Sequence, residues 1–437
     1  MLKRVEEIKE KFLKAIESKP VEIISHHDTD GITSAAILAT ALSRLDKKFS
    51  IKIVKQLESE TLKETSNKNV TIFLDLASSA LTELSSKENI FIIDHHEIPG
   101  KIPENINFIN PHEFDKQEIS AAGLTYLFVK SIDSKNKDLS NLAVVGMIGD
   151  MLDRNISKLN NSVLNDAEVI IKKGLLLYPA TRPINRTLEF SSSMFIPGVT
   201  GNSRGVFELL KEAGIEKQNS EYKSLIELDE QEMSRLITQI MLRVIEKKPE
   251  ELIGNIYLVK FFNRLQDARE LSATINACSR LDYSDVALSF CLGSKKALKR
   301  AEDIYVEYKQ HLMDALNYIT RSEKIEGKNY VIINAKQEIK DTIIGTVASI
   351  LSNSPNYLEG TIIATMAYSG EKIKISLRVA GRNGNRNVRE LLESIVNEVG
   401  GECGGHPLAA GCLIDKSKEE AFLNLLKSRL EIQVIKI

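Results

Sequence analysis

Tryptophan is absent from this 437-residue chain, and cysteine is scarce. The four cysteines, Cys278, Cys291, Cys403 and Cys412, include no C-x-x-C pair. That spacing argues against a zinc knuckle, and the thiols do not form the dense pattern of a disulfide framework. We therefore interpret them as reduced, intracellular thiols.

Long apolar runs are also missing. No run approaches the roughly 20 residues that a membrane-spanning helix needs. Residues 1–20 have a charged amphipathic helix pattern, which differs from that of a signal peptide. We therefore expect a cytoplasmic protein without a membrane partner.

The chain has no large excess of charge of either sign, because 58 Lys and Arg residues face 60 Asp and Glu residues. A net charge of −2 excludes a polycation that binds nucleic acid by bulk charge, so such binding would need local patches. What is present is globular composition, with 43% hydrophobic and 27% charged residues. A chain of this length holds two or three domains of roughly 150 residues each.

Short apolar runs alternate with amphipathic stretches over the first 150 residues. The predicted strands are VEIIS (21–25), FSIKIV (49–54), VTIFLD (70–75) and IFIID (90–94). The predicted helices cover 32–45, 57–66, 78–86, 117–133 and 138–149. This alternation indicates βαβ units and a mostly parallel sheet, in which ligands bind beyond the carboxyl ends of the strands.

The pattern becomes mainly helical after about residue 155, and β signals return from about 328. In the middle we predict helices at 160–173, 203–213, 222–247, 267–280 and 295–320, and a strand pair at 253–260 and 285–291. Beyond it, NYVIINA, TIIATMAY and KIKISLRVA are predicted strands, with helices at 341–352, 386–398 and 418–429. We therefore divide the chain into an α/β domain (1–155), a mainly helical connecting region (156–327) and a second α/β domain (328–437).

Three candidate metal ligands lie in the hexapeptide HHDTDG, which follows the first predicted strand. His26, Asp28 and Asp30 alternate along the chain, so their side chains can converge from an extended strand end. Gly31 would let the chain turn into the next helix. Carboxylates mixed with imidazole suit Mn²⁺ or Mg²⁺ better than a thiol-binding metal. Taken alone, the hexapeptide is also compatible with a helix cap and a polar turn.

Other acidic and histidine residues follow other apolar segments. Asp75 ends VTIFLD, Asp94-His95-His96 ends IFIID, and Asp150 ends LAVVGMIGD. Each has an ordinary alternative as a helix cap, a polar turn or a helix-terminal acid. Together they are less ordinary, because four of the seven histidines in the chain lie in the two histidine-containing motifs. Two metals about 3.5–4 Å apart need a bridging carboxylate and a set of oxygen and nitrogen ligands of this kind.

The order H-x-D-x-D-G, Asp, Asp-His-His, Gly-Asp resembles that of the DHH phosphoesterase superfamily. The segment ECGGHPLAAG (402–411) is similar to the Gly-Gly-His motif of the DHH-associated C-terminal domain. The segment LSATINACSRLDYSDVALSFCLG (271–293) resembles a stretch of RecJ-type nucleases, particularly archaeal ones. The superfamily resemblance covers about 20–155 and 328–437, and its motifs are specific in combination.

The resemblance implies two divalent metal ions, with Mn²⁺ favoured and Mg²⁺ as the alternative. One metal would be held by His26, Asp28 and Asp75, and the other by Asp30, Asp75, His95 and Asp150. Asp75 would therefore bridge the two metals. His96 would face the scissile phosphate, and Asp94 would orient a neighbouring imidazole. His27 occupies a position that is usually not a ligand in the family.

Residues 371–389 carry six basic side chains and one acid. The basic residues are Lys372, Lys374, Arg378, Arg382, Arg386 and Arg389. One interpretation is a solvated basic strand and loop. The other is a phosphate-contacting edge with Arg378 facing the metals, because arginine binds phosphate bidentately.

In the Gly-rich segment, Gly404 and Gly405 would let backbone amides approach an anion closely. His406 would contact the nucleotide phosphate and precede a helix start of small residues. We therefore expect an N-terminal DHH domain with a mostly parallel sheet and a C-terminal α/β domain that faces it across a cleft. Single-stranded nucleic acid would thread through that cleft.

The leading functional hypothesis is a RecJ-like single-strand exonuclease that hydrolyses DNA or RNA to mononucleotides in repair or replication. The second is an oligoribonuclease that degrades very short RNAs or cyclic dinucleotides. The third belongs to another class, a scaffold subunit of the replicative helicase that has lost catalysis and binds the GINS complex. An inorganic pyrophosphatase is the last alternative, but that group usually carries a different C-terminal domain.

Overall fold

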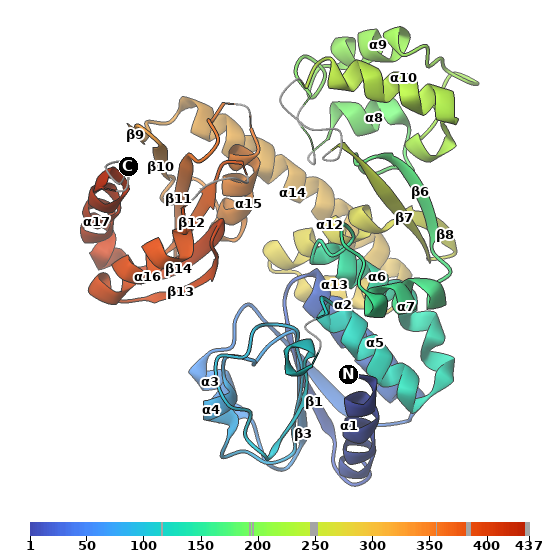
Figure 1. Cartoon of the computed structure of the whole chain (residues 1–437), viewed down its shortest axis with the longest axis vertical. Coiled ribbons are helices and arrows are strands. Elements are labelled where there is room, and N and C mark those ends of the chain that lie inside the picture. The colour runs from blue at the N-terminus through green and yellow to red at the C-terminus, as the bar shows by residue number, and fades with distance from the viewer. Residues whose placement is uncertain are drawn as a thin grey trace. The chain divides into compact units, whose positions relative to one another are not determined.

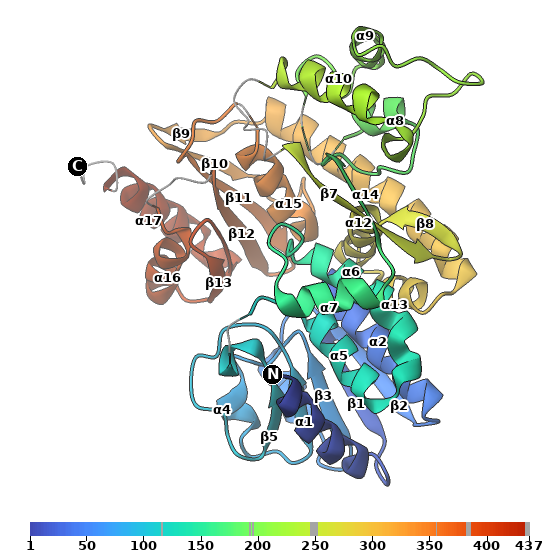
Figure 2. The same ribbon diagram turned by 45° about the vertical axis from the view of Figure 1, so that its right-hand side comes forward.

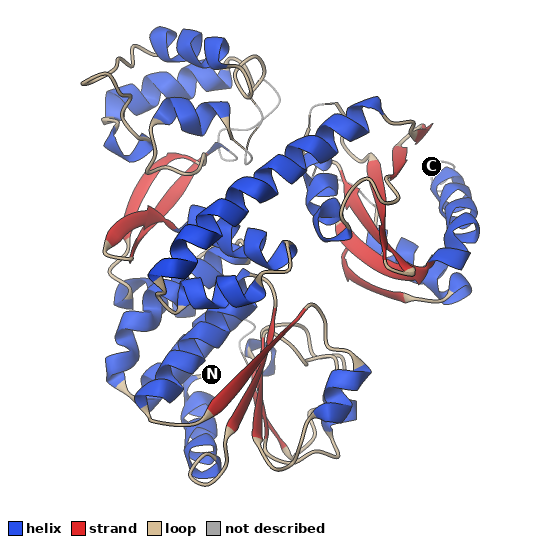
Figure 3. Ribbon diagram, turned by 180° about the vertical axis from the view of Figure 1, so that it is seen from behind, coloured by secondary structure: helices blue, strands red, loops and turns tan. Residues whose placement is uncertain are grey.

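The structure is a computed structural model that describes residues 1–114, 117–191, 194, 196–244, 252–354, 356–381 and 386–432. It divides into two compact units, Met1–Tyr305 and Val306–Ile437. Helix α14 (Lys295–Arg321) passes through the point of division as one continuous helix (Figure 3). Within the described part of the chain, no helix combines the length and hydropathy that a bilayer crossing requires.

The first unit is built on a five-stranded sheet with the strand order β2-β1-β3-β4-β5, in which every pairing is parallel. Its strands are β1 (Val21–His26), β2 (Phe49–Val54), β3 (Val70–Leu74), β4 (Ile90–Ile93) and β5 (Ile106–Ile109). The predicted mixture of strands and helices with a parallel N-terminal sheet is confirmed. The edge strand β5 was not predicted, because its four residues include a polar Asn107 and give only a weak apolar signal.

Helices cover both faces of this sheet (Figure 1). On one face, Phe12 of α1 (Leu2–Ala15) meets Phe91 of β4 and Phe128 of α5 (Ala121–Ile132) edge to face. The opposite face packs against α3 (Ser59–Glu64) and α4 (Leu81–Leu84) in a core that includes Phe73 and Phe108. Further helices of this part are α2 (Thr29–Arg44), α6 (Ser140–Gly149) and α7 (Lys158–Asp166).

The middle of the chain has its own core, built on a three-stranded antiparallel sheet and a group of helices (Figure 2). The strands are β6 (Ile170–Leu175), β7 (Ile253–Phe261) and β8 (Arg264–Asp267). The helices packed with β6 and β7 are α8 (Ile184–Glu189), α9 (Ser203–Glu212) and α10 (Glu230–Met241). Two further helices, α12 (Ala268–Arg280) and α13 (Ser284–Cys291), return to pack against α2.

Several predictions for this middle part are wrong. The predicted helix 160–173 ends at Asp166, and its last residues belong to β6, because pairing with β7 overrides their local pattern. The predicted strand 285–291 is helix α13, whose buried residues Ala287, Phe290 and Cys291 have helical spacing. Residues 245–247 of the predicted helix 222–247 lie outside the described residues, and the α-helix in the described part is α10, which begins at Glu230 behind an Asp229 capping box.

The second unit contains a six-stranded mixed sheet with the order β13-β14-β12-β11-β10-β9. The strands are β9 (Ile325–Gly327), β10 (Tyr330–Asn334), β11 (Ile362–Ser369), β12 (Lys372–Val379), β13 (Glu402–His406) and β14 (Ala409–Asp415). Helix α15 (Asp341–Ser352) packs against β11 and β12, and α16 (Val388–Val399) and α17 (Glu419–Ile432) cover the other face through a shared core. The helix start predicted after His406 is wrong, because Ala409–Asp415 pairs as a strand with both β12 and β13.

Candidate metal centre

The six predicted metal ligands meet at the carboxyl edge of the parallel sheet. They lie in three groups of side chains whose ligand atoms are within 4.8 Å of one another. The groups are His26-Asp28-Asp75, Asp30-His95-Asp150 and Asp75-His95-His96. The first group contains the residues of the first predicted ligand set, and the second contains those of the other set without Asp75. The third shares Asp75 and His95 with them and includes His96, which was predicted to face the phosphate. Residues from the ends of β1, β3, β4 and α6 thus converge, as strand-end placement predicts.

The turn from β1 into α2 displays Asp28. The carboxylate oxygen Oδ1 accepts a hydrogen bond from the backbone N–H of Gly31 at 3.0 Å and so caps the helix. The other oxygen, Oδ2, lies 3.1 Å from Nδ1 of His26. A glycine is needed at 31, because a Cβ there would lie 2.3 Å from the carbonyl oxygen of His26. The helix cap that the sequence left open as an alternative is therefore present alongside the ligand geometry.

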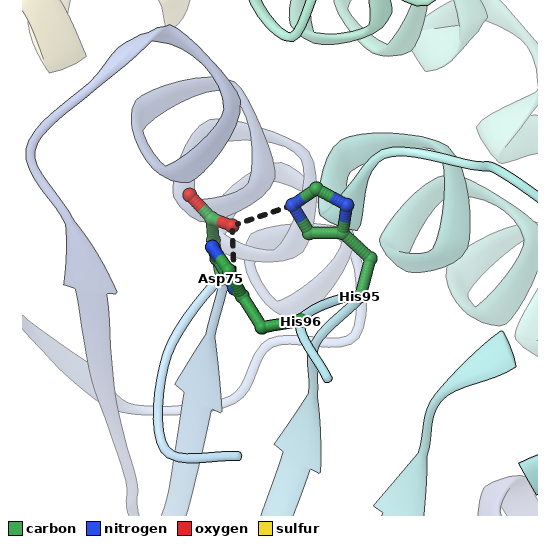
Figure 4. Close-up of side chains that lie close together, drawn as sticks. All are labelled: Asp75, His95 and His96. Atoms are coloured by element: carbon green, nitrogen blue, oxygen red, sulfur yellow. Dashed lines mark ion pairs between the residues drawn. The ribbon is translucent and has the colours of Figure 1, made fainter. Parts of the chain in front are cut away.

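Asp75 lies directly after β3 with a left-handed backbone φ of 58°, and it is 2% exposed. Its Oδ2 is 3.2 Å from Nδ1 of His26, and its Oδ1 is 3.3 Å from Nε2 of His95. The imidazoles of His95 and His96 both face this Oδ1 (Figure 4). A left-handed non-glycine residue costs backbone free energy and is common at functional sites. The two oxygens of Asp75 thus point to different partners, which is the arrangement a bridging ligand requires.

Asp30 is fully buried, and its carboxylate also accepts hydrogen bonds from another helix. Its Oδ2 and Oδ1 accept hydrogen bonds from the backbone N–H groups of Ala121 (2.6 Å) and Ala122 (2.9 Å), at the start of α5. The carboxylate therefore satisfies the free donors of a helix N-terminus. Burial, followed by the charge of Asp75, raises the pKa of Asp30 to about 7. Oδ2 lies 4.0 Å from Nε2 of His95, so Asp30 still borders the second ligand group.

Asp94 organises the loop after β4. Its Oδ1 accepts hydrogen bonds from the backbone N–H groups of His95 (2.8 Å) and His96 (3.3 Å) and lies 2.7 Å from Nδ1 of His96. Its Oδ2 accepts from the backbone N–H of Ser78 at 3.0 Å. Burial raises the pKa of Asp94, but the hydrogen bonds from His96 and Ser78 outweigh it and hold that pKa well below its usual value. Asp94 thus has the contact that orienting His96 requires.

Buried charged groups lie close together in this site and shift the pKa values of one another. Burial lowers the pKa of His26 and of His95, but the carboxylates around them raise both pKa values well above the usual imidazole value. Burial and the charge of Asp30 raise the pKa of Asp150 well above that of an ordinary carboxyl group. His27 belongs to none of the three ligand groups, and burial lowers the pKa of its ring to about 4. Protons are therefore strongly held where a cation would bind.

Two carboxylate oxygen atoms test whether metal ions suit this cluster. Asp75 Oδ1 and Asp150 Oδ2 are buried and accept no hydrogen bond within the described residues. They lie 3.3 and 3.2 Å from Nε2 of His95. A buried carboxylate oxygen without a donor is costly, and a divalent cation between these groups would satisfy it. The mixed carboxylate and imidazole donor set fits divalent metals such as Mn²⁺ or Mg²⁺.

Two asparagines that support the site were missed by sequence reasoning. The side-chain amide of Asn110 donates to the carbonyl oxygen of His96 at 2.9 Å. Asn110 follows β5, so its strand-end position was the available signal, concealed by the weak strand pattern. Asn276 of α12 accepts a hydrogen bond from the backbone N–H of Thr29 at 3.1 Å. Asn276 lies in the segment 271–293 that resembles RecJ-type nucleases, and that resemblance assigns no role to this residue.

The predicted phosphate-binding residues lie in the second unit. Arg378, Ala409 and His406 are aligned across β12, β14 and β13 by the strand register. Because directly opposed residues point to the same face of an antiparallel sheet, Arg378 and His406 share a face. The Nε of Arg378 donates to Ser349 at 3.0 Å, and its Nη1 donates to the carbonyl oxygen of Leu377 at 2.9 Å. These bonds orient the guanidinium, whereas its predicted position facing the metals stays a prediction.

The Gly-rich segment and the basic residues around Arg378 differ in exposure. Gly404 and His406 lie on the exposed edge strand β13, and a Cβ at Gly404 would meet no atom within 4 Å. Gly405 needs its glycine, because its φ is +133° and a Cβ would lie 2.5 Å from the carbonyl oxygen of Ala409. Arg386 donates to the carbonyl oxygen of Asn329, and Arg382 lies outside the described residues. The exposed edge leaves room for an anion beside Gly404.

Comparison with known proteins adds three family matches along the chain. Residues 20–149 match the N-terminal domain of the DHH family, 177–255 the DHH-CID domain, and 327–431 the DHHA1 domain. An uncharacterized protein of Methanocaldococcus jannaschii is 30% identical over 446 residues, which cover 97% of this chain and 97% of that protein.

Solved structures share the fold at low sequence identity. RecJ from Thermus thermophilus in complex with Mn²⁺ has a TM-score of 0.62 and 18% identity over 98% of this chain. The match covers only 54% of that RecJ chain. An exonuclease RecJ bound to manganese has a TM-score of 0.60 and 17% identity, covering 97% of this chain and 94% of the other. CDC45 from Entamoeba histolytica has a TM-score of 0.67 and 12% identity, covering 97% and 98%.

Proposed function

This chain belongs to the DHH superfamily of phosphoesterases as a RecJ-like member, and on that premise we propose that it is a divalent-metal-dependent exonuclease. Its substrates would be single-stranded DNA or RNA, hydrolysed at phosphodiester bonds to mononucleotides in repair or replication. The observation that supports this proposal is the convergence of the six predicted ligands, among which two buried carboxylate oxygens accept no hydrogen bond within the described residues.

The ligand set favours an enzyme over a scaffold that has lost catalysis. Carboxylates buried side by side, with the pKa of Asp30 raised to about 7 and that of Asp150 raised well above its usual value, destabilise a fold unless cations bind them. A scaffold that binds a protein complex such as GINS has no need for such a cluster. The likeness to CDC45 supports the scaffold alternative only at the level of the fold.

The residues around the cluster suit phosphodiester hydrolysis. Bound metal ions would lower the pKa of an attacking water and neutralise phosphate charge. Asp94 engages Nδ1 of His96, so Nε2 is the ring nitrogen left for a phosphate oxygen. The same hydrogen bond raises the pKa of His96, which favours the charged imidazolium, and its side chain is 55% exposed. His96 can therefore stabilise negative charge that develops on the phosphate.

The second unit would supply further phosphate contacts. Arg378 has the planar, donor-rich head group that recognises phosphate, and its bonds to Ser349 and Leu377 fix its orientation. His406 and the backbone of Gly404 and Gly405 lie along the exposed strand β13. These residues would bind the nucleotide and orient the scissile bond.

Digestion of 5′- and 3′-labelled single strands of DNA and RNA, with Mn²⁺ or Mg²⁺, tests the proposal. We expect mononucleotide release by the wild-type chain and none by Asp28→Ala. Asp303→Ala, which removes an exposed carboxylate on α14, is the matched control and should digest like wild type. Degradation of dinucleotides alone would favour the oligoribonuclease. A wild-type chain that binds Mn²⁺ without cleaving any of these substrates would contradict the proposal.

A further inference from the structure

A helix from outside the matched family domains holds the loop that carries the metal ligands. Helix α12 contains Ser272 and Asn276, and both lie beyond the stretches 20–149, 177–255 and 327–431. We propose that Asn276 is a positioning residue for the metal centre, which acts through Thr29 with the help of Ser272. The inference rests on the proposed function, because it concerns the same metal site.

The contacts form one junction at Thr29, which is 1% exposed. Its backbone N–H donates to Oδ1 of Asn276 at 3.1 Å. Its hydroxyl donates to the carbonyl oxygen of Ser272 at 3.0 Å, and the hydroxyl of Ser272 donates to Thr29 Oγ1 at 3.2 Å. Thr29 stands between Asp28 and Asp30, so this junction fixes the backbone between two ligands.

The need for an acceptor at Asn276 follows from the position of Thr29. It is the first residue of α2, and the N–H groups of a first helical turn have no acceptor within the helix. The cap residue Asp28 uses Oδ1 for the N–H of Gly31. Asn276 supplies the acceptor for the N–H of Thr29, so Oδ2 of Asp28 remains on the side of His26. An amide oxygen does this without adding another negative charge to the acidic cluster.

The same junction reaches a third ligand through α6. A Cβ at Gly149 would lie 2.8 Å from Cβ of Thr29 and 3.5 Å from Oγ of Ser272. Helices α2, α6 and α12 therefore meet at Thr29 with no space for a further methyl group. Because Asp150 directly follows Gly149, a shift of α12 would displace Asp28, Asp30 and Asp150 together. Asn276 thus couples the middle of the chain to half of the predicted ligands.

The test measures Mn²⁺ binding by calorimetry in the absence of substrate. We expect Asn276→Ala to weaken Mn²⁺ binding about 10- to 100-fold, as loss of a supporting hydrogen bond does at other metal sites. Asn276→Gln keeps an uncharged amide acceptor and should retain more of the Mn²⁺ binding than Asn276→Ala. Ser279→Ala is the matched control, because it removes a buried hydroxyl of the same helix that has no hydrogen-bond partner within the described residues. It should bind Mn²⁺ like wild type.

Activity against Mn²⁺ concentration separates positioning from damage to the fold. For Asn276→Ala we expect the half-saturating Mn²⁺ concentration to rise, with kcat recovered at saturation. Unchanged Mn²⁺ affinity, or an equal loss in Asn276→Ala and Ser279→Ala, overturns the inference. If Asn276→Ala does not fold, Asn276→Leu removes the acceptor oxygen while keeping a side chain of similar size, and unchanged Mn²⁺ binding by that variant overturns the inference as well. A wild-type chain that binds no Mn²⁺ would overturn the proposed function itself.

Discussion

The metal centre and the Gly-Gly-His strand are two parts of the predicted site, and they are built in opposite ways. Asp30, Asp75 and Asp94 are almost completely buried, and Asp30 and Asp94 accept hydrogen bonds from backbone N–H groups. In contrast, Gly404 and His406 lie on an exposed edge strand that pairs only with β14 within the described residues. Buried charges need a framework that holds them before a cation arrives. An exposed strand has few contacts on its outer side, so changes there should affect binding and leave the fold intact.

Replacement of Asp75, which belongs to two of the three candidate ligand groups, should cause the largest loss of activity. Asp75→Asn keeps the size of the side chain, and asparagine tolerates the left-handed φ of 58° at this position. We expect activity to fall at least about 1000-fold, which is about 4 kcal/mol at 1.36 kcal/mol per tenfold. Calorimetry should also show the loss of tight Mn²⁺ binding. Asp303→Asn is the matched surface control, and an Asp75→Asn protein that retains activity would refute the bridging assignment.

Addition of a single methyl group tests how tightly the residues around the metal centre are packed. In Gly146→Ala, the new Cβ would lie 2.5 Å from Cβ of Ala122 and 2.6 Å from Oδ1 of Asp30. We expect the free energy of unfolding to fall by about 1–3 kcal/mol, as overpacking does elsewhere, with weaker Mn²⁺ binding. Urea unfolding measures the change. Gly100→Ala, where a Cβ meets no atom within 4 Å, is the control, and equal stability of both variants would argue against a rigid framework.

Substitutions on the exposed strand β13 should change substrate binding alone. For His406→Ala we expect KM to rise about tenfold, or about 1.4 kcal/mol of binding free energy, with kcat within about threefold of wild type. The melting temperature and the Mn²⁺ affinity should not change, because the side chain is exposed and distant in sequence from every predicted ligand. Steady-state kinetics on labelled single strands gives both constants. A lower Mn²⁺ affinity in this variant would contradict the separation of the two halves.

The smallest expected effect is a pH dependence of metal-induced stability. The pKa of Asp30 is raised to about 7, and those of His26, His95 and Asp150 are raised well above their usual values. Asp30 holds a proton that the unfolded chain releases between about pH 4 and 7, and His26 and His95 do so in the window above about pH 6.5, so the stabilisation from these protons fades as pH rises. Below that window His27 acts in the opposite direction, because its pKa is lowered to about 4.

Metal binding displaces the protons held by these carboxylates and imidazoles, so it should remove the pH dependence of the stability. We expect the melting temperature of the metal-free protein to fall by a few degrees across the window, on the scale of about 1 kcal/mol, and that of the Mn²⁺-loaded protein to change less. Thermal scans with chelator and with Mn²⁺ compare the two forms. Parallel curves would show that the raised pKa values are not linked to the metal site.

The sequence predicted those parts of the site that depend on local residue patterns. Buried parallel strands leave short, nearly continuous apolar runs, so the strand ends at His26, Asp75 and Asp94 could be located, and ligands bind beyond such ends. Local patterns failed where pairing or packing decides. Ala409–Asp415 contains the small residues of a helix start, but β12 and β13 pair with it on both sides. The apolar residues around Phe290 resemble a strand, but α13 buries them at helical spacing.

Tertiary contacts explain what the sequence could not supply. The hydrogen bond between Thr29 and Asn276 joins residues 247 positions apart, and no local pattern carries that distance. The attachment of Asp30 to the start of α5 likewise depends on how two helices pack. Residue types therefore indicated which side chains gather at the site, whereas the structure is needed to see which of them also support the backbone.

That distinction matters for genetics, because ligand mutations at this site are not equivalent alleles. A change at Asp30 would remove a predicted metal ligand and also the acceptor for the N–H groups at the start of α5, so its phenotype would combine lost activity with lost protein. Asp28 has the same ambiguity at α2. Asp150 differs, because no backbone N–H within the described residues donates to its carboxylate, and its Oδ2 has no hydrogen-bond partner there. We therefore expect Asp150→Asn to be a separation-of-function allele, in which the protein persists in the cell while the proposed metal chemistry is lost.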